Sequence, residues 1–257
     1  AFDAKAAPGR QSCSDPEILY LWRNRWRYGP FTQSRYVKYS AIMPAFNAAA
    51  TIAAAIESML GQSLPPEEIV VVDDGSADAT ADIARACDPC VKVIRQDNRG
   101  AGAATNLAIA QTRLPVIASL DADDIWLPEK METQLRHLAA HPEASAVFTH
   151  LRTFRDDGLR AGADVVGPGW SRSTMVIYRQ AAVATGDFID LPGSGRGEMV
   201  DWLARGRHLG LRLDMLDEVH ALRRVRSGSL SYGRDADKDK GYARVAWLAL
   251  QRRKGKA

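Results

Sequence analysis

Short apolar runs alternate regularly with helix-like segments between Tyr39 and Thr149. The run at 69–72 (IVVV) is β-branched and apolar at every position, as in a strand that is covered on both faces of a parallel sheet. The segments between such runs carry apolar residues at helical spacing, as Ile52 and Ile56 do. This alternation predicts an α/β fold with right-handed crossovers.

The same pattern places the individual elements. We expect strands at 39–43 (ended by Pro44), 68–72, 91–94, 115–120 and 144–149, and helices at 48–60, 77–86, 102–111 and 128–140. After Phe154 the pattern loosens into a Gly- and Asp-rich excursion at 155–170, a strand at 173–178, helices at 179–184 and 198–206, and a strand at 211–216.

Polar segments follow the expected strands of the first half. In open α/β sheets, ligands bind beyond the carboxyl ends of the strands, so these segments are the expected site. They are Pro44–Asn47, Asp73–Ser76, Gln96–Gly100 and Asp121–Asp124. Three of the four carry carboxylates, which indicates a site that holds a cation or hydrogen-bond donors.

The acidic turn, residues 121–124 (DADD), suits one divalent cation. Asp121 and Asp123 are two positions apart, so on an extended stretch their side chains point the same way. Mg²⁺ or Mn²⁺ takes one or two such carboxylates and completes its shell with phosphate oxygens and water. We expect Asp124 to cap the helix that begins near Pro128 instead.

Asp73 and Asp74 open a turn in which Gly75 supplies a permissive backbone and Ser76 suits a helix cap. A carboxylate there can also accept a hydrogen bond from a base N–H or a ribose hydroxyl. We expect at least one of the two acids to contact a ligand.

Together these segments resemble the family 2 glycosyltransferases, which have the GT-A fold. The matching text is SAIMPAFN at 40–47, EIVVVDDGSAD at 68–78, Asn98-Arg99-Gly100 leading to Asn106, and LDADDIWLPEK at 120–130. The resemblance is close over about 40–150 and loose over about 170–230, and the segments match in order and spacing. It implies a central, mostly parallel sheet flanked by helices, and an inverting transfer from a nucleoside-diphosphate sugar.

The resemblance also implies roles for the strand-end residues. Asp121 and Asp123 would be the Asp-X-Asp pair that holds Mn²⁺ or Mg²⁺, with Asp123 the more direct ligand. The residues expected to contact the nucleotide-sugar are Pro44, Ala45, Asn47, Asp73 or Asp74, Arg99, Asp121 and Ala122.

The catalytic base of this family lies in a later Glu-Asp motif at a helix start, usually followed by Trp. The matching segment here is GEMVDWL at 197–203, in which the Glu-Asp pair is not intact. By resemblance, Glu198 is the first candidate for the base and Asp201 the second, although Asp201 also suits a solvated helix face. Residues 223–226 (RRVR) fall where relatives carry basic residues or His near the phosphates, with Arg226 in a place that often holds His.

These expectations divide the chain into an N-terminal extension (1–37), a nucleotide-sugar-binding half (38–154), an acceptor-binding half of the same domain (155–233) and a basic C-terminal tail or helix (234–257). The resemblance favours a UDP-sugar donor and allows a saccharide, a lipid or a peptide as acceptor.

The distribution of charge along the chain argues against a nucleic-acid partner. The net charge of +3 comes from Arg and Lys near the ends, whereas the region from Asp73 to Asp124 is rich in Asp, so no nucleic-acid partner is expected. The sequence has no apolar run of 18 residues and no signal-peptide core near its start, so we expect a cytoplasmic protein. Residues 19–28 (LYLWRNRWRY) are expected to pack on the domain, or to rest on anionic lipid at the inner face of the membrane.

The sequence gives less support to functions other than glycosyl transfer. Gly100-Ala101-Gly102 lacks the third glycine of a dinucleotide fingerprint, and Cys87 and Cys90 have no second ligand pair, so both features are expected to be incidental. His137 and His141 are expected on the surface. A nucleotidyltransferase would carry a Gly-rich basic loop after its first strand, which residues 44–48 (PAFNA) are not. A catalytically inactive nucleotide-sugar-binding module remains an alternative, because the Glu-Asp motif is broken.

Overall fold

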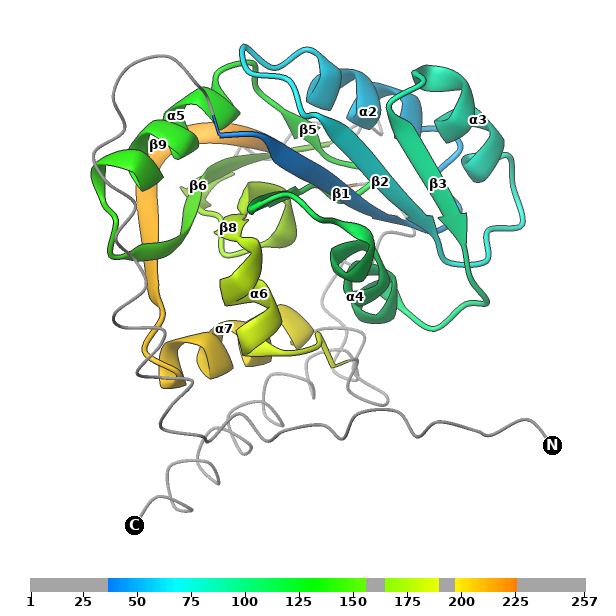
Figure 1. Cartoon of the computed structure of the whole chain (residues 1–257). Coiled ribbons are helices and arrows are strands. Elements are labelled where there is room, and N and C mark those ends of the chain that lie inside the picture. Colours follow the sequence, from blue (N-terminus) through cyan, green and yellow to red (C-terminus); the bar gives the residue numbers. More distant parts are fainter. Residues whose placement is uncertain (1–36, 156–164, 190–196, 226–257) are drawn as a thin grey trace, which may run out of the picture. The chain divides into compact units, whose positions relative to one another are not determined.

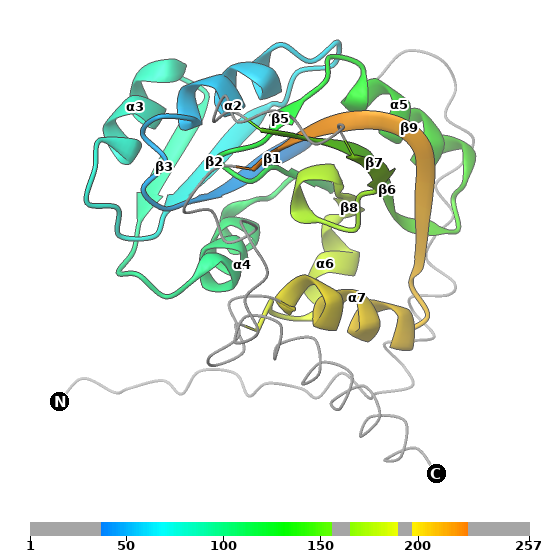
Figure 2. The same cartoon turned by 180° about the vertical axis from the view of Figure 1, so that it is seen from behind.

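A mixed sheet of nine strands with helices on both faces makes up the part of the chain that this computed structural model describes, residues 37–155, 165–189 and 197–225 (Figures 1 and 2). The strand order is β3-β2-β1-β4-β8-β6-β9-β5, and β7 pairs with β6 outside this path. The predicted α/β class is confirmed.

The first half of the sheet is parallel and follows the predicted alternation. Its elements are β1 (Tyr39–Ala45), α2 (Ile52–Leu60), β2 (Glu68–Asp73), α3 (Thr80–Cys87), β3 (Val91–Arg95), α4 (Ala101–Gln111) and β4 (Val116–Ser119). β1 lies between β2 and β4, with Ile42 beside both Val70 and Ser119. The carboxyl ends of β1, β2, β3 and β4 therefore meet at one edge, where the polar segments were expected.

Pro44 does not end the first strand, contrary to expectation. β1 continues to Ala45, and Pro44 pairs beside Val72. In a central strand, the backbone groups of successive residues form hydrogen bonds alternately to the strand on either side. The carbonyl of Ile42 accepts from the N–H of Leu120 (3.1 Å), on the side of β4. Pro44 faces that same side two residues later, where β4 has already ended, so its missing N–H removes no ladder bond.

The second half of the sheet contains both parallel and antiparallel strand pairs. Its elements are β5 (Ile125–Trp126), α5 (Lys130–Ala140), β6 (Ala144–Arg155), β7 (Val165–Pro168), the 3₁₀ turn η1 (Arg172–Thr174), β8 (Val176–Tyr178), α6 (Arg179–Thr185), α7 (Glu198–His208) and β9 (Arg212–Val225). β8 is antiparallel to β4 and β6, β9 is parallel to β6, and β5 is antiparallel to β9. The long β9 brings the basic segment that contains Arg224 back to the strand β5, directly after the acidic turn.

Helices cover the sheet on both sides. In Figures 1 and 2, α2, α3 and α5 lie over one face, and α4, α6 and α7 lie under the other. Apolar side chains from β1, β2 and β4 form a continuous buried core with α2 and α5. Both faces of the central strands are thus covered, which explains their unbroken apolar sequences.

Two features of the second half differ from the sequence prediction. The expected strand at 173–178 begins as η1, because the hydroxyl of Ser173 donates to Asp124 and that of Thr174 donates to the carbonyl of Gly169. The excursion at 155–170 contains the short strand β7, which pairs antiparallel with β6.

The histidine pair on α5 was predicted to lie on the surface, and for His137 that is wrong. Its Nε2 lies 2.8 Å from Asp214 Oδ2, and its side chain is 18% exposed. The ring of His141 packs against that of His137, with 4.3 Å between centroids. Cys87 and Cys90 are half-buried free thiols.

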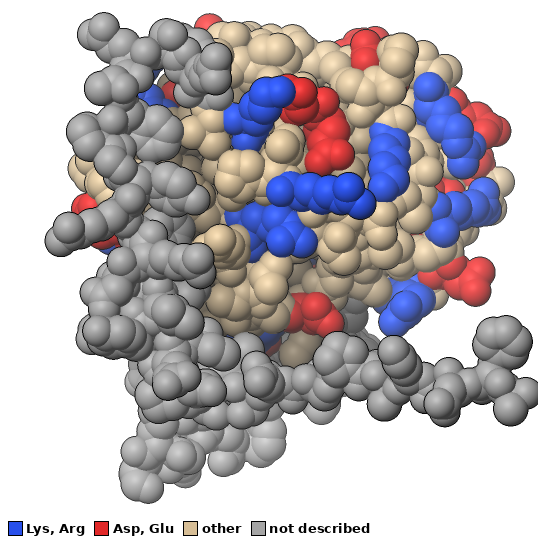
Figure 3. Space-filling model, in the orientation of Figure 1, with Lys and Arg blue, Asp and Glu red and all other residues tan. Residues whose placement is uncertain are grey.

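The visible face of the described domain carries mixed charge, with Lys and Arg side chains interspersed with acids (Figure 3). Among the described helices, none is long and apolar enough to cross a membrane. The predicted extension at 1–37, except Val37, and the predicted tail at 234–257 lie outside the described residues.

Candidate active site

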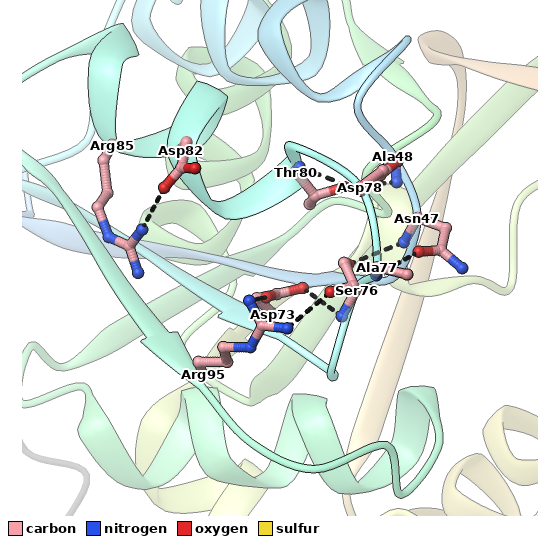
Figure 4. A network of polar contacts seen from close by, with 10 residues as sticks. All are labelled: Asn47, Ala48, Asp73, Ser76, Ala77, Asp78, Thr80, Asp82, Arg85 and Arg95. Atoms are coloured by element: carbon pink, nitrogen blue, oxygen red, sulfur yellow. Dashed lines mark hydrogen bonds and ion pairs between the residues drawn. The ribbon is translucent and has the colours of Figure 1, made fainter.

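Asn47 joins the loops that follow β1 and β2. Its backbone adopts a positive φ of 47°, a conformation that Asn tolerates better than most residues. The N–H of Asn47 donates to the Ser76 hydroxyl (2.9 Å), and its own side-chain carbonyl accepts from the N–H of Ala77 (2.9 Å; Figure 4). Ser76 is therefore part of a link between two strand ends, and Asn47, although exposed, is held in place.

Asp73 ends β2 and is fully buried. Its Oδ1 accepts from the N–H of Ser76 (3.1 Å), and its Oδ2 lies 3.6 Å from Nη1 of Arg95 (Figure 4). Among the described residues, Oδ2 has no hydrogen-bond partner. The charge of Arg95 offsets that of this oxygen, but the oxygen accepts no hydrogen bond and is the part of Asp73 that can accept from a ligand donor.

Asp74 is also buried, but its oxygens are occupied. Oδ1 accepts from Gln96 Nε2 (2.6 Å) and from the N–H of Arg99 (2.9 Å), and Oδ2 accepts from the N–H of Gly100 (2.8 Å). Gly100 precedes the first residue of α4, so this carboxylate also lies at the positive end of a helix. Asp74 thus fixes the loop that presents the exposed side chain of Arg99.

A hollow of about 570 Å³ lies beside these strand ends, lined by Gly75, Arg95, Gln96, Asp97 and Asn98. Gly75 has φ 77°, and a Cβ at this position would lie 2.9 Å from the backbone nitrogen of Asn98. Glycine is required here because the loops after β2 and β3 approach so closely.

The acidic turn follows β4. Asp121 and Asp123 are partly exposed, whereas Ala122 and Asp124 are buried. Asp124 does not cap the following helix as predicted, because α5 begins at Lys130. It instead accepts from the Ser173 hydroxyl (2.6 Å) and from the N–H of Arg224 (3.0 Å), which joins the turn to η1 and β9.

Burial, and then the charges of Asp121 and Asp123, raise the pKa of Asp124 to about 8. Asp124 is thus held close to two carboxylates whose charges disfavour its own ionisation. Arg224 lies close by, since its Nε donates to the carbonyl of Asp123 (3.1 Å). Arg226 lies outside the described residues.

These residues fit a divalent metal only in part. Within the described ranges, no group of three or more His, Cys, Asp or Glu residues could hold a metal ion. Asp121 and Asp123 would supply two carboxylates, a number that suits Mg²⁺ or Mn²⁺ when phosphate oxygens and water complete the shell. The site would therefore hold its metal together with a phosphate ligand.

Arg172, which belongs to none of the sequence motifs, joins the acidic turn to α7. Its Nε donates to Asp121 Oδ1 (2.8 Å), and its Nη1 donates to Glu198 Oε1 (3.0 Å). The three side chains are 10%, 29% and 16% exposed, for Arg172, Asp121 and Glu198 in turn. No motif or spacing marked this arginine, because only the folded chain brings 121, 172 and 198 together.

Glu198 is the first residue of α7, whose preceding residue Gly197 is left-handed with φ 111°. The structure brings Glu198 to the acidic turn through its contact with Arg172, which also contacts Asp121. Asp201 lies one turn later and is 1% exposed, with Oδ2 accepting from Arg205 Nε (2.9 Å). The expectation that Asp201 lies on a solvated helix face is wrong, because α7 turns this residue inward.

The chain matches a known protein family over more than half of its length. The family model described as glycosyl transferase family 2 matches residues 40–197. That match spans the acidic turn, Arg172 and most of the sheet. The chain belongs to this family, and the resemblance drawn from the strand-end segments is confirmed.

Curated relatives agree with this assignment. Chondroitin synthase of Escherichia coli is 31% identical over 162 residues, which are 62% of this chain and 24% of that protein. The succinoglycan biosynthesis protein ExoU of Rhizobium meliloti (strain 1021) is 47% identical over 35% of this chain and 27% of its own length. The putative glycosyltransferase EpsH of Bacillus subtilis (strain 168) is 34% identical over 49% of this chain and 37% of its own. This chain thus spans well under half the length of these relatives.

Solved structures show the same fold. The crystal structure of S. aureus TarS 1-349 in complex with UDP-GlcNAc matches with a TM-score of 0.62 and 20% identity, over 82% of this chain and 66% of that chain. At that identity the likeness establishes the fold.

Proposed function

We propose that this chain is a metal-dependent inverting glycosyltransferase, or the transferase part of one, that uses a nucleoside-diphosphate sugar. The observation that carries the proposal is the convergence of the acidic turn and Glu198 on one guanidinium, that of Arg172. Such a transfer needs a metal-binding pair and a carboxylate base on the same side of the site, and Asp121 of the turn and Glu198 contact the same side chain.

For the donor we propose a UDP-sugar, because a chain with the same fold was solved with UDP-GlcNAc. The base and ribose would lie against the ends of β1, β2 and β3, and Pro44, Ala45 and Asn47 would form one wall of that site. Asp73 is the better candidate for the contact with the base or ribose, since its Oδ2 is unsatisfied whereas Asp74 holds the loop. Arg99 is exposed at the same edge.

The reaction would be a single displacement. Glu198 takes the proton of an acceptor hydroxyl, and the hydroxyl oxygen forms a bond to the anomeric carbon. The bond from that carbon to the diphosphate oxygen breaks with its electron pair, so the sugar changes configuration and the nucleoside diphosphate leaves. A divalent metal on Asp121 and Asp123 would offset the charge on the leaving diphosphate. Arg224, beside the turn, would add a positive charge from the protein.

Glu198 is preferred over Asp201 as the base. The carboxylate of Asp201 is paired with Arg205 and almost fully buried, so an acceptor hydroxyl cannot approach it. Glu198 remains partly exposed beside the acidic turn.

The test is the hydrolysis or transfer of a panel of nucleotide-sugars with Mn²⁺, comparing wild type, Glu198→Gln and Glu218→Gln. Glu218 is exposed on β9 and serves as the matched control. Turnover that persists in Glu198→Gln at the wild-type rate would contradict the assignment of the base.

The second candidate is a catalytically inactive nucleotide-sugar-binding module. The specific observation in its favour is that both acids of the broken motif are engaged by arginines, Glu198 by Arg172 and Asp201 by Arg205. Tight nucleotide binding with no turnover of any donor would favour this function.

A further inference from the structure

Arg172 is held by a frame of hydrogen bonds that does not depend on its own side chain. The Ser173 carbonyl accepts from Trp126 Nε1 (2.7 Å), and the Ser173 hydroxyl donates to Asp124 (2.6 Å). Gln134 Nε2 donates to the Thr174 carbonyl (2.8 Å). The backbone from which Arg172 projects is therefore fixed against the acidic turn, which lies between β4 and β5.

The two acids that Arg172 contacts are held differently. Asp121 belongs to the turn, whereas Glu198 begins a helix that packs through Trp202, whose ring stacks on Phe188 at 4.7 Å. Residues 121 and 198 lie on elements far apart in the chain, and η1 joins them through one side chain. Arg172 thus fixes the position of Glu198 relative to the acidic turn.

Arg172 contacts only one oxygen of each carboxylate, so the other oxygen of Asp121 and of Glu198 is left for the reaction. Arg172 contacts Oδ1 of Asp121 through Nε and Oε1 of Glu198 through Nη1. A carboxylate has a second oxygen with its own lone pairs, so Asp121 can still bind a metal and Glu198 can still take a proton. The planar guanidinium presents these two donors in fixed directions.

The charge of Arg172 is also secure. An arginine side chain stays protonated in proteins, and here its guanidinium lies 2.8 Å from Asp121 and 3.0 Å from Glu198. The cation separates two carboxylates that would otherwise repel each other across a largely buried space.

We propose that Arg172 is a positioning residue of the transfer reaction: it holds Glu198 beside the acidic turn through one carboxylate oxygen and leaves the other for the proton of the acceptor hydroxyl. This inference rests on the proposed function and extends it to the residue that aligns the base. It predicts that the loss of Arg172 slows the chemical step and leaves nucleotide binding largely intact.

The experiment uses the full chain, UDP-GlcNAc as the probe donor, and MnCl₂. The hydrolysis rate and the Kd for UDP are measured for wild type, Arg172→Ala and Arg172→Lys. Because a displacement of about 1 Å at a reacting group costs roughly 100-fold, kcat of Arg172→Ala should fall by about that factor. The Kd for UDP should change by less than about threefold, since the lost interaction acts on the chemical step.

Two further readouts separate positioning from a general structural role. Guanidinium chloride at low millimolar concentration should restore part of the rate of Arg172→Ala, but none of the rate of Glu198→Gln. Arg172→Lys keeps the stem and the charge, so it should fold, yet a single ammonium cannot reproduce the two-pronged geometry and its kcat should be intermediate.

Arg212→Gln is the matched control. Arg212 also contacts two carboxylates, Asp214 (2.8 Å) and Glu143 (2.5 Å), but it is 48% exposed and lies in another part of the described chain. Its kcat should equal that of wild type.

Two results would overturn the inference: a wild-type kcat in Arg172→Ala and Arg172→Lys, or a loss of UDP affinity that matches the loss of rate. The second result would make Arg172 a donor-binding residue. Failure of the proposed function is distinguishable, because in that case wild type itself would neither bind UDP nor hydrolyse UDP-GlcNAc.

Discussion

Replacing Asp74 tests whether this acid holds the nucleotide-side loops or contacts the ligand. The carboxylate is 3% exposed and accepts three hydrogen bonds, from Gln96, Arg99 and Gly100. In Asp74→Ala these donors lose their acceptor. An unsatisfied buried donor costs about 1–3 kcal/mol, and water can reach part of this loop, so the variant should lose about 2–4 kcal/mol of unfolding free energy.

Asp74→Asn should lose less, about 1–2 kcal/mol, because its carbonyl oxygen still accepts while its amide faces the N–H of Gly100 as a second donor. The assay is urea unfolding followed by tryptophan fluorescence, with the slope against urea compared across variants to confirm that the same surface is exposed. The control is Asp82→Ala, since Asp82 is 85% exposed and pairs with Arg85 on the surface. That variant should stay within about 0.5 kcal/mol of wild type.

The reasoning would be refuted if Asp74→Ala were as stable as Asp82→Ala and yet failed to bind UDP. Asp74 would then be a ligand contact, and its hydrogen bonds to the loop would contribute little to the fold.

Three further predictions follow from other contacts. Asn106 makes two hydrogen bonds to the backbone of Phe188 (2.9 and 2.8 Å) and so connects α4 to the segment after α6. Asn106→Ala should lower the free energy of unfolding in urea by about 1–3 kcal/mol, and an unchanged value would contradict this role. Gly75→Ala should lose at least about 1 kcal/mol because of its positive φ and its contact with Asn98, and should weaken UDP binding by calorimetry; wild-type values for both would refute the steric argument. Lys130 is fully buried over the ring of Trp126 (4.1 Å), and burial lowers its pKa well below the ordinary value. Between the lowered pKa of the folded state and the unfolded value of about 10.4, the unfolded state therefore binds more protons, so the unfolding free energy of wild type should rise with pH. Melting scans at a series of pH values should show this rise in wild type and not in Lys130→Met. The same dependence of stability on pH in both proteins would show that Lys130 is charged in the folded protein.

The sequence predicted the parallel half of the fold well, because local pattern and tertiary environment agree there. The run at 69–72 is apolar on both faces, and β2 is buried on both faces. Gly75 and Asn47 stand at positions with positive φ, for which their residue types are suited.

The second half was harder to predict because long-range contacts decide its structure. Ser173 and Thr174 lie in an apolar run that reads as a strand, but their hydroxyls bond to Asp124 and Gly169 and form a 3₁₀ turn. Asp124 reads as a helix cap by its distance from Pro128, yet its partners come from η1 and β9. Spacing along the chain carries no information about such partners.

Some residues of the candidate site could be identified from sequence motifs, and others only from the structure. Asp121, Asp123 and Glu198 were identified from motifs, and the structure brings Asp121 and Glu198 onto one arginine. Arg172 itself could not be identified, since an isolated arginine before a short strand has no distinctive pattern. The burial of Asp201 also depends on which face of α7 packs inward, which its partly matching motif did not reveal.

The most direct test of the central claim is calorimetric titration of UDP into wild type and Asp123→Asn, each with Mn²⁺ and with EDTA. The acidic turn is proposed to bind the nucleotide through a metal, so wild type should bind UDP with Mn²⁺ and lose at least about tenfold in affinity with EDTA, which corresponds to about 1.4 kcal/mol. Asp123→Asn should show the weak affinity under both conditions. UDP binding that is equally tight with EDTA and in Asp123→Asn would contradict the account, and so would a wild-type protein that binds no UDP at all.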